Sequence, residues 1–154
     1  MSILEKWFSN QEPCRAITTF ERITLRLSGM RGVTEYEIVG KDGRAEVSQY
    51  GIRFSRGEDS RVLERRALCD ENTVLTLLND CRLLSWDGFD GPHPKGVLDG
   101  TMFTLQAVVN GDQKISAQGS ENFPRHYREF RDGLHQILEQ QNDCTRQETG
   151  DARG

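Results

Sequence analysis

The sequence predicts an α+β domain, with an antiparallel sheet of five or six strands and two main helices packed on one face of that sheet. Three observations favour this class. Apolar and polar residues alternate after Ile17, two segments have helical apolar spacing, and a second alternating block lies between these two segments. The expected order is therefore β-β-β-(β)-α-β-β-α. A parallel sheet is not expected, because strands and helices do not alternate regularly along the chain.

The first strands are recognised by alternation and by the turns between them. Ile23, Leu25 and Leu27 share one face of the first strand, and polar residues occupy the other. The Asp-Gly step at 42–43 suits a tight hairpin between the second and third strands. Within the third strand the apolar positions change phase, which predicts a β-bulge around 49–51.

The first main helix is predicted after a segment whose pattern is ambiguous. Residues 60–68 have features of both a helix and an edge strand, and we expect a strand. Asp70 then has the position of a helix N-cap. The apolar residues at positions i, i+3, i+4 and i+7 of this helix are Val74, Leu77, Leu78 and Cys81. One face of the helix is therefore expected to be buried.

The last part of the chain predicts a hairpin and a second helix. Asn110-Gly111 is the strongest short hairpin signal in the sequence and indicates a strand on each side. The final helix is expected to have Pro124 in its first turn, where the missing N–H costs nothing. Its apolar stripe consists of Phe123, Tyr127, Phe130, Leu134, Ile137 and Leu138.

The expected organisation is a single α+β domain at residues 17–141. A short helix and a linker at 1–16 precede it, and a tail at 142–154 without apolar periodicity is expected to be disordered. A length of 154 residues is sufficient for one hydrophobic core.

Composition limits the classes of function. The formal net charge of −4 disfavours direct nucleic-acid binding, which depends on cations that neutralise phosphates. The four cysteines are widely spaced and form no zinc motif, so we expect reduced thiols and no metal or other cofactor. No signal peptide or membrane-spanning segment is recognised. A cytoplasmic protein is therefore expected, or a secreted or lipid-anchored one only if an N-terminal signal has been removed.

The segment "SWDGFDGPHPKGVLDG", Ser85–Gly100, concentrates residues that are typical of functional loops. Trp86 and Phe89 lie on either side of an Asp-Gly turn. They are candidate anchors for a protein partner. The alternative is that both face the core and fix the loop, and this interpretation is favoured because an exposed Trp-Phe pair promotes aggregation.

The polar residues of the same loop match no known catalytic or metal motif. An EF-hand is excluded by spacing, although an irregular cation site from Asp87, Asp90 and Asp99 stays open. His93 with Asp87 or Asp90 has the residue types of a general base and its orienting carboxylate, but no nucleophile motif accompanies them. A small hydrolase that uses this loop and a small-ligand or metal-binding module are therefore alternatives, and no catalytic residue is assigned.

Two further groups of residues are candidates for contact with a partner. Trp7 and Phe8 belong to the apolar segment "ILEKWF", which is expected to dock on the domain or to bind another protein. Arg125, Arg128 and Arg131 share one face of the final helix. Acidic residues interleave with these arginines, so a solvated helix face is favoured over a phosphate-binding site.

The chain also resembles a family of small bacterial α+β domains of unknown function that is associated with Gram-positive bacteria. The similarity covers Ile17–Leu138, and its most specific parts are the Trp86–Pro94 loop and "GSENFP" at Gly119–Pro124. Members of that family often occur as secreted or lipid-anchored proteins. The resemblance implies no catalytic residues, and this chain has no lipobox cysteine before the domain.

These observations lead to the hypothesis of a non-catalytic domain that binds another protein. It would serve as a regulator, an inhibitor or a subunit of a larger protein, and self-association into a homo-oligomer is a further alternative. One version of the hypothesis is an inhibitor, encoded by a mobile element, of a nucleic-acid-binding protein. The acidic composition permits this version without requiring it.

Overall fold

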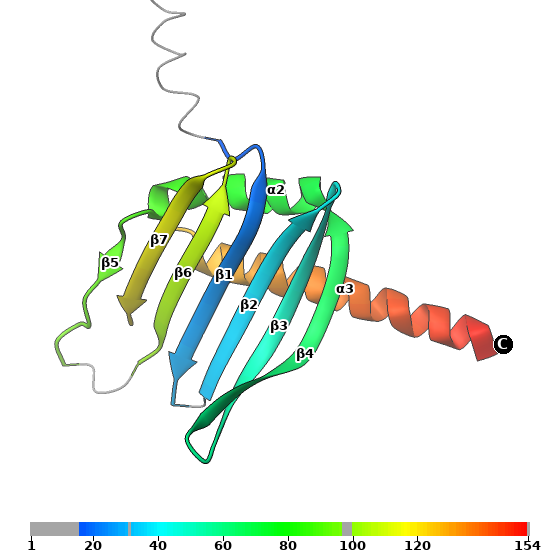
Figure 1. The fold of residues 1–154 in the computed structure, drawn as a ribbon, viewed down its shortest axis with the longest axis horizontal. Coiled ribbons are helices and arrows are strands. Elements are labelled where there is room, and N and C mark those ends of the chain that lie inside the picture. Colours follow the sequence, from blue (N-terminus) through cyan, green and yellow to red (C-terminus); the bar gives the residue numbers. More distant parts are fainter. Residues whose placement is uncertain (1–15, 31, 97–99, 154) are drawn as a thin grey trace, which may run out of the picture.

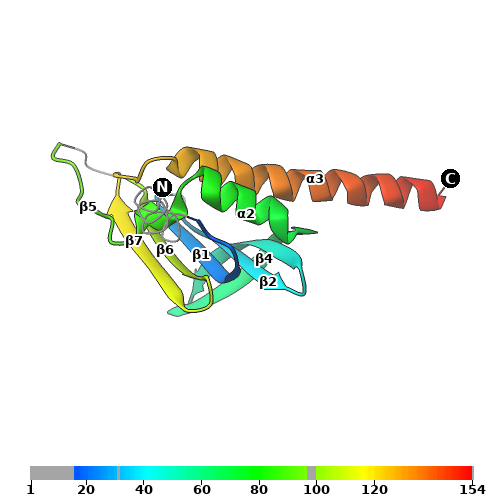
Figure 2. The same cartoon turned by 90° about the horizontal axis from the view of Figure 1, so that it is seen from above.

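The computed structural model describes the backbone of residues 16–30, 32–96 and 100–153, and the side chains of these ranges as far as residue 140. In these ranges the chain forms one seven-stranded sheet with two α-helices. Both helices lie on the same side of the sheet, as the two perpendicular views show (Figures 1 and 2). The opposite side, which we call the open face, is covered by neither helix.

The order of elements begins with a four-stranded meander and ends with the longer helix. The elements are β1 (Phe20–Gly29), β2 (Gly32–Lys41), β3 (Arg44–Ser55), β4 (Glu58–Asp70), α2 (Glu71–Asp80), the 3₁₀ turn η2 (Leu83–Trp86), β5 (Asp90–Gly91), β6 (Met102–Val109), β7 (Gln113–Ser120) and α3 (Tyr127–Arg153). In space the strand order is β4-β3-β2-β1-β6-β7-β5.

The predicted α+β class and the two helices are confirmed, and segment 60–68 is part of a strand, β4. The expectation of a purely antiparallel sheet of five or six strands is wrong in detail, because β5 adds a seventh strand that runs parallel to β7. This strand has two residues, too few for any alternation to be visible in the sequence. It is held beside β7 by backbone bonds, from Gly88 N to Ser116 O and from Gln118 N to Phe89 O.

The expected bulge is at the predicted place, but its extra residue lies in the neighbouring strand. The pairing of β3 with β4 shifts between Gln49 and Tyr50, and Glu64 of β4 is the unpaired residue. The apolar positions of β3 change phase because the apolar residues in the second half of the strand lie on the other face of the sheet. Ala45 and Val47 face the helices, whereas Tyr50 and the positions that follow it at intervals of two lie on the open face.

The turns follow the sequence closely. Asp42 and Gly43 both have positive φ angles, 54° and 77°, as a two-residue turn between twisted strands requires. Asn110 and Gly111 also have positive φ angles and lie in the β6–β7 turn. The Asn110 side chain has a second role, since its Oδ1 accepts a bond of 2.8 Å from Thr18 N and thereby positions the start of β1.

The core lies between the helices and the sheet. Phe130, Leu134 and Leu138 of α3 are completely buried, as predicted from their spacing. α2 contributes Val74 and Leu78. Asp70 is the N-cap residue of α2 as expected, although its side chain makes no capping hydrogen bond.

The final helix begins later and ends later than the sequence predicts. Pro124 precedes α3 and accepts a hydrogen bond from Tyr127 N instead of lying in the first turn. The helix then continues through residues 142–153, for which a disordered tail was expected. Extension of an existing helix needs no new nucleation, and this segment contains no proline.

Replacement of Gly119 by alanine is expected to destabilise the protein. A Cβ at this β7 position would meet the carbonyl oxygen of Asn122 and lie 2.7 Å from Cε1 of Phe103. Overpacking of this kind costs about 1–3 kcal/mol in the free energy of unfolding, measurable by urea denaturation. Gly29→Ala is the matched control, because its new Cβ would make an ordinary contact of 3.5 Å with Thr101. Equal stability of the two variants would contradict the packing argument.

Candidate functional site

The open face is organised as rows of side chains that cross the strands. Antiparallel partners share a face, so the strand register identifies each row. The row nearest the Asp42-Gly43 turn, which we call the first row, consists of Leu68, Glu46, Val39, Arg22, Val108 and Lys114. The second row consists of Arg66, Ser48, Glu37, Thr24, Gln106 and Ser116. The third consists of Leu63, Tyr50, Glu35, Arg26, Thr104 and Gln118.

An ion-pair cluster occupies the middle of the open face. Glu37 pairs with Arg22 at 2.9 Å, and Glu35 pairs with Arg61 at 3.2 Å. Arg61 also lies 3.7 Å from Glu37, and Arg26 lies 3.8 Å from Glu35. Both glutamate side chains are only 14% exposed, so three arginines cover two carboxylates. The guanidinium of Arg61 is in addition stacked 3.8 Å above the ring of Tyr50.

Apolar side chains are exposed near the two sides of this cluster. Six large apolar residues of the described chain are exposed, and four of them, Phe54, Leu63, Leu68 and Met102, lie on the open face. Leu63 and Leu68 belong to the edge strand β4, whereas Met102 lies on β6 across the sheet. The open face therefore combines a charged centre with exposed apolar side chains at its margins.

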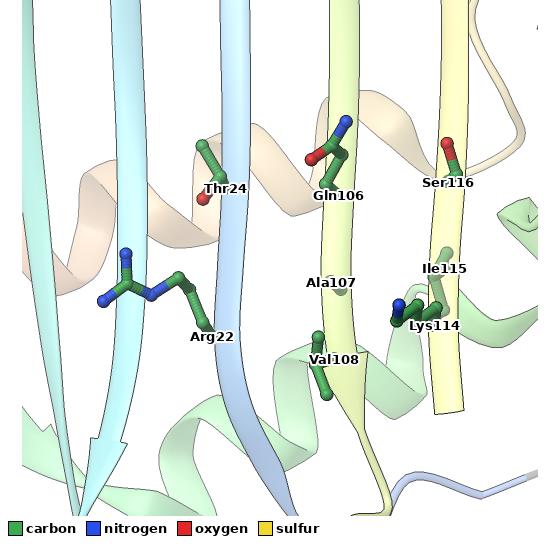
Figure 3. Close-up of a pocket in the computed structure, with 8 residues that line it drawn as sticks. All are labelled: Arg22, Thr24, Gln106, Ala107, Val108, Lys114, Ile115 and Ser116. Carbon is green, nitrogen blue, oxygen red and sulfur yellow. The ribbon is translucent and has the colours of Figure 1, made fainter. Parts of the chain in front are cut away.

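Two hollows are present on the open face. The first, of 390 Å³, is formed over β1, β6 and β7, and Figure 3 views it with the helices behind the sheet. Its lining includes Arg22, Gln106, Val108 and Lys114. The second hollow, of 450 Å³, lies over the ends of β2, β3 and β4 and includes Val39, Arg44 and Leu68.

The aromatic residues of the 85–100 loop face inward. Trp86 is 1% exposed, and its Nε1 donates a hydrogen bond of 3.0 Å to the carbonyl oxygen of Arg125. Its ring meets Phe130 edge-on, with 5.5 Å between ring centroids. Phe89 is partly buried, and its ring centroid lies 6.0 Å from the ring centroid of Phe103. The favoured interpretation, that both residues fix the loop to the core, therefore describes this structure.

The polar residues of the loop serve its attachment to β7. Asp87 Oδ1 accepts a hydrogen bond of 2.9 Å from Ser116 N, and Asp90 belongs to β5. His93 Nδ1 lies 2.8 Å from Ser120 Oγ at the exposed end of β7. This pair has the residue types of a base and a nucleophile, but the hollows described here are lined by other residues. Within the described ranges, no three His, Cys, Asp or Glu side chains come together as metal ligands.

The remaining candidates are separated from the open face. Arg125 lies in the turn before α3, whereas Arg128 and Arg131 lie on the helix, on the opposite side of the sheet. Arg128 is exposed, and Arg131 is half-buried. Trp7 and Phe8 lie outside the described residues, so their predicted role in partner binding stays a prediction.

The chain matches no protein-family model and no curated protein. Its resemblance to small bacterial domains of unknown function therefore stays a proposal. In the described part of the chain, neither helix combines the length and the apolar character needed to cross a membrane.

A polar chain under α3 was missed by the sequence analysis. Nη2 of Arg65 donates to Nδ1 of His135 at 2.8 Å, and Nε2 of His135 lies 2.8 Å from the Tyr36 hydroxyl. Because arginine can only donate, Nδ1 is unprotonated and Nε2 carries the proton. Gln49 continues the chain by accepting from Arg65 at 2.6 Å and donating to Glu64 at 3.1 Å.

The surroundings of these hydrogen bonds favour the uncharged forms of His135 and Tyr36. Burial lowers the pKa of His135, and the cations of Arg65 and Arg131 lower it further. Burial likewise raises the pKa of the Tyr36 hydroxyl. These hydrogen bonds link α3 to β2, β3 and β4. Two of them join residues that are 70 and 99 positions apart in the sequence, so local sequence patterns could not reveal them. The free thiol of Cys81 also has a pKa raised by burial, to about 11, consistent with a structural cysteine.

Acidification is expected to destabilise the fold through His135. In the unfolded chain this histidine has an ordinary pKa of about 6.5. The folded-state pKa is lower, so the unfolded state binds more protons between the two values. The contribution of the neutral imidazole is complete above about pH 6.5 and is lost as the pH falls toward the folded-state pKa.

Urea denaturation at pH 7.5 and pH 5.5 tests this expectation. His135→Gln should reduce stability at pH 7.5 by about 0.5–1.5 kcal/mol, through loss of a hydrogen bond, and should weaken the dependence on pH. His93→Gln, which leaves the chain under α3 intact, is the control and should retain the dependence of the native protein. An unchanged pH dependence in His135→Gln would show that other groups cause it.

Proposed function

We propose that this protein is a non-catalytic domain that binds another protein through the open face of its sheet. The observation that carries the proposal is the composition of this face: an ion-pair cluster flanked by four exposed apolar side chains, on a sheet whose other face is covered by helices. A solvated antiparallel sheet commonly has a polar outer face. Leu63 and Leu68, both on β4, go beyond that, since their exposure leaves apolar surface in contact with water.

The form of this function is also proposed. Regulator, inhibitor and subunit are the roles that such a surface supports, and inhibition of a nucleic-acid-binding protein is one of them. The open face carries both signs of charge and no stacked array of aromatic residues among its described positions, which favours a protein over a nucleic acid as partner. A cytoplasmic location and a bacterial origin belong to the same proposal. Self-association would make a second copy of this chain the partner.

An affinity pull-down from an extract of the native host tests the proposal. The double variant Leu63→Glu/Leu68→Glu places two charges on the open face, where burial of unpaired carboxylates would oppose binding. We expect recovery of the partner to fall at least about tenfold, equivalent to about 1.4 kcal/mol of binding free energy. The matched control is Met30→Glu/Val62→Glu, which changes two exposed apolar residues away from the open face.

Both double variants should unfold in urea within about 1 kcal/mol of the native protein, since all four side chains are exposed. Size-exclusion chromatography with light scattering identifies a second copy of the chain as the partner. Equal loss of partner in the two variants, or full retention in the open-face variant, would contradict the assignment of this surface. Failure to recover any specific partner in repeated experiments would contradict protein binding as the function.

A further inference from the structure

The two hollows of the open face meet along the first row. Arg22 lines one hollow and Val39 lines the other, and these two residues are direct partners in the pairing of β1 with β2. Val108 and Lys114 extend the row to β7, and Leu68 ends it on β4. At this end of the sheet β4, β3, β2, β1, β6 and β7 lie side by side in that order (Figure 1). Apolar and charged side chains alternate along the whole row.

Cations outnumber carboxylates among the residues that line the two hollows. Arg22 is already paired with Glu37 at 2.9 Å, and Glu46 lies 3.6 Å from Arg66. Lys41, Arg44 and Lys114 form no ion pair with any residue in the described part of the chain, although they line the same two hollows. Asp42 is the carboxylate in the linings that has no such pair. The two linings therefore hold four cations, Arg22, Lys41, Arg44 and Lys114, and two carboxylates, Asp42 and Glu46, on a chain whose net charge is −4.

We propose that the first row binds an acidic, amphipathic segment of a partner protein, lying across the strands. This inference rests on the proposed function and specifies the chemistry of the partner. Apolar side chains of the segment contact Val39, Leu68 and Val108, and its carboxylates lie against the unpaired cations. Charge complementarity of this kind determines orientation and partner choice.

The dimensions of the row fit such a segment. Six strands separated by about 4.8 Å span about 24 Å, the length of a helix of about 16 residues. The row runs across the strands of the twisted sheet and does not follow one strand. The pitch of an α-helix, about 5.4 Å, is close to the spacing between strands, so successive turns of an amphipathic helix can lie over successive strands. A single-stranded nucleic acid is a poorer fit, because its bases require aromatic stacking partners and the first row contains none.

Site-specific photocrosslinking in the native host tests the inference with the full-length chain. A photoreactive benzoylphenylalanine replaces Gln106, which is exposed, lines the first hollow and lies beside the row. The same residue at Met102 samples the far end of the open face, and at Gln136 it samples α3 on the other side of the molecule. Mass spectrometry then identifies the segment attached at each position.

The inference predicts that Gln106 crosslinks to a protein segment rich in Asp or Glu, with apolar residues at helical spacing. The charge reversals Lys41→Glu/Lys114→Glu should lower the crosslink yield about tenfold, through loss of charge complementarity. Lys95→Glu/Arg128→Glu makes the same change in net charge away from the open face and should leave the yield unchanged.

The possible results separate this inference from the proposed function. A basic or neutral segment at Gln106, or an attached nucleic acid, would overturn the inference. Crosslinks to a protein from Met102 alone would also overturn it, while they would support the open face as the binding surface. Attachment of a protein from Gln136 alone, or from none of the three positions, would overturn both.

Discussion

The structure depends on the packing of two helices against one face of a single sheet. Phe130, Leu134 and Leu138 of α3 are completely buried, and they meet strands whose apolar residues point to the same side. Burial of each such side chain contributes about 1.5–3 kcal/mol. Two helices cover one face and leave the other to be stabilised differently. The ion-pair cluster of the open face follows from this constraint, because arginine and glutamate can cover a pleated surface with their aliphatic parts while their charges stay partly hydrated.

The two faces of the sheet use polar groups in opposite ways. Under α3, the bond between Arg65 and His135 requires a neutral imidazole, and burial maintains that state. On the open face, by contrast, Glu35 and Glu37 are charged groups surrounded by arginines. The polar groups under α3 therefore position this helix on the sheet through hydrogen bonds. Those on the open face form ion pairs at the surface. This division explains why the open face, and not the polar chain under α3, is assigned to partner binding.

Sequence patterns predicted the strands, the helices and the turns, because these depend on periodicity and on local backbone conformation. The sequence also favours an interior position for Trp86, but the bond of its Nε1 to the carbonyl oxygen of Arg125 joins residues that are 39 positions apart. The first row could not be predicted for the same reason. Its members come from six strands, and each of them appears in the sequence as an ordinary polar or apolar residue. Register, which is fixed by the bulge at Glu64 and by the turn lengths, is what brings them together.

The paired charges of the open face also affect how it would bind. Arg22, Arg26 and Arg61 are already held by Glu35 and Glu37, so a partner that contacts them need not restrict freely rotating side chains. Each long side chain that is ordered only on binding costs about 0.5–1.5 kcal/mol. The unpaired Lys41, Arg44 and Lys114 are exposed and differ in this respect, because their longer-range field acts mainly on the rate of encounter. The paired arginines at the centre of the sheet therefore favour affinity, whereas the exposed, unpaired cations at one end favour selection of the partner.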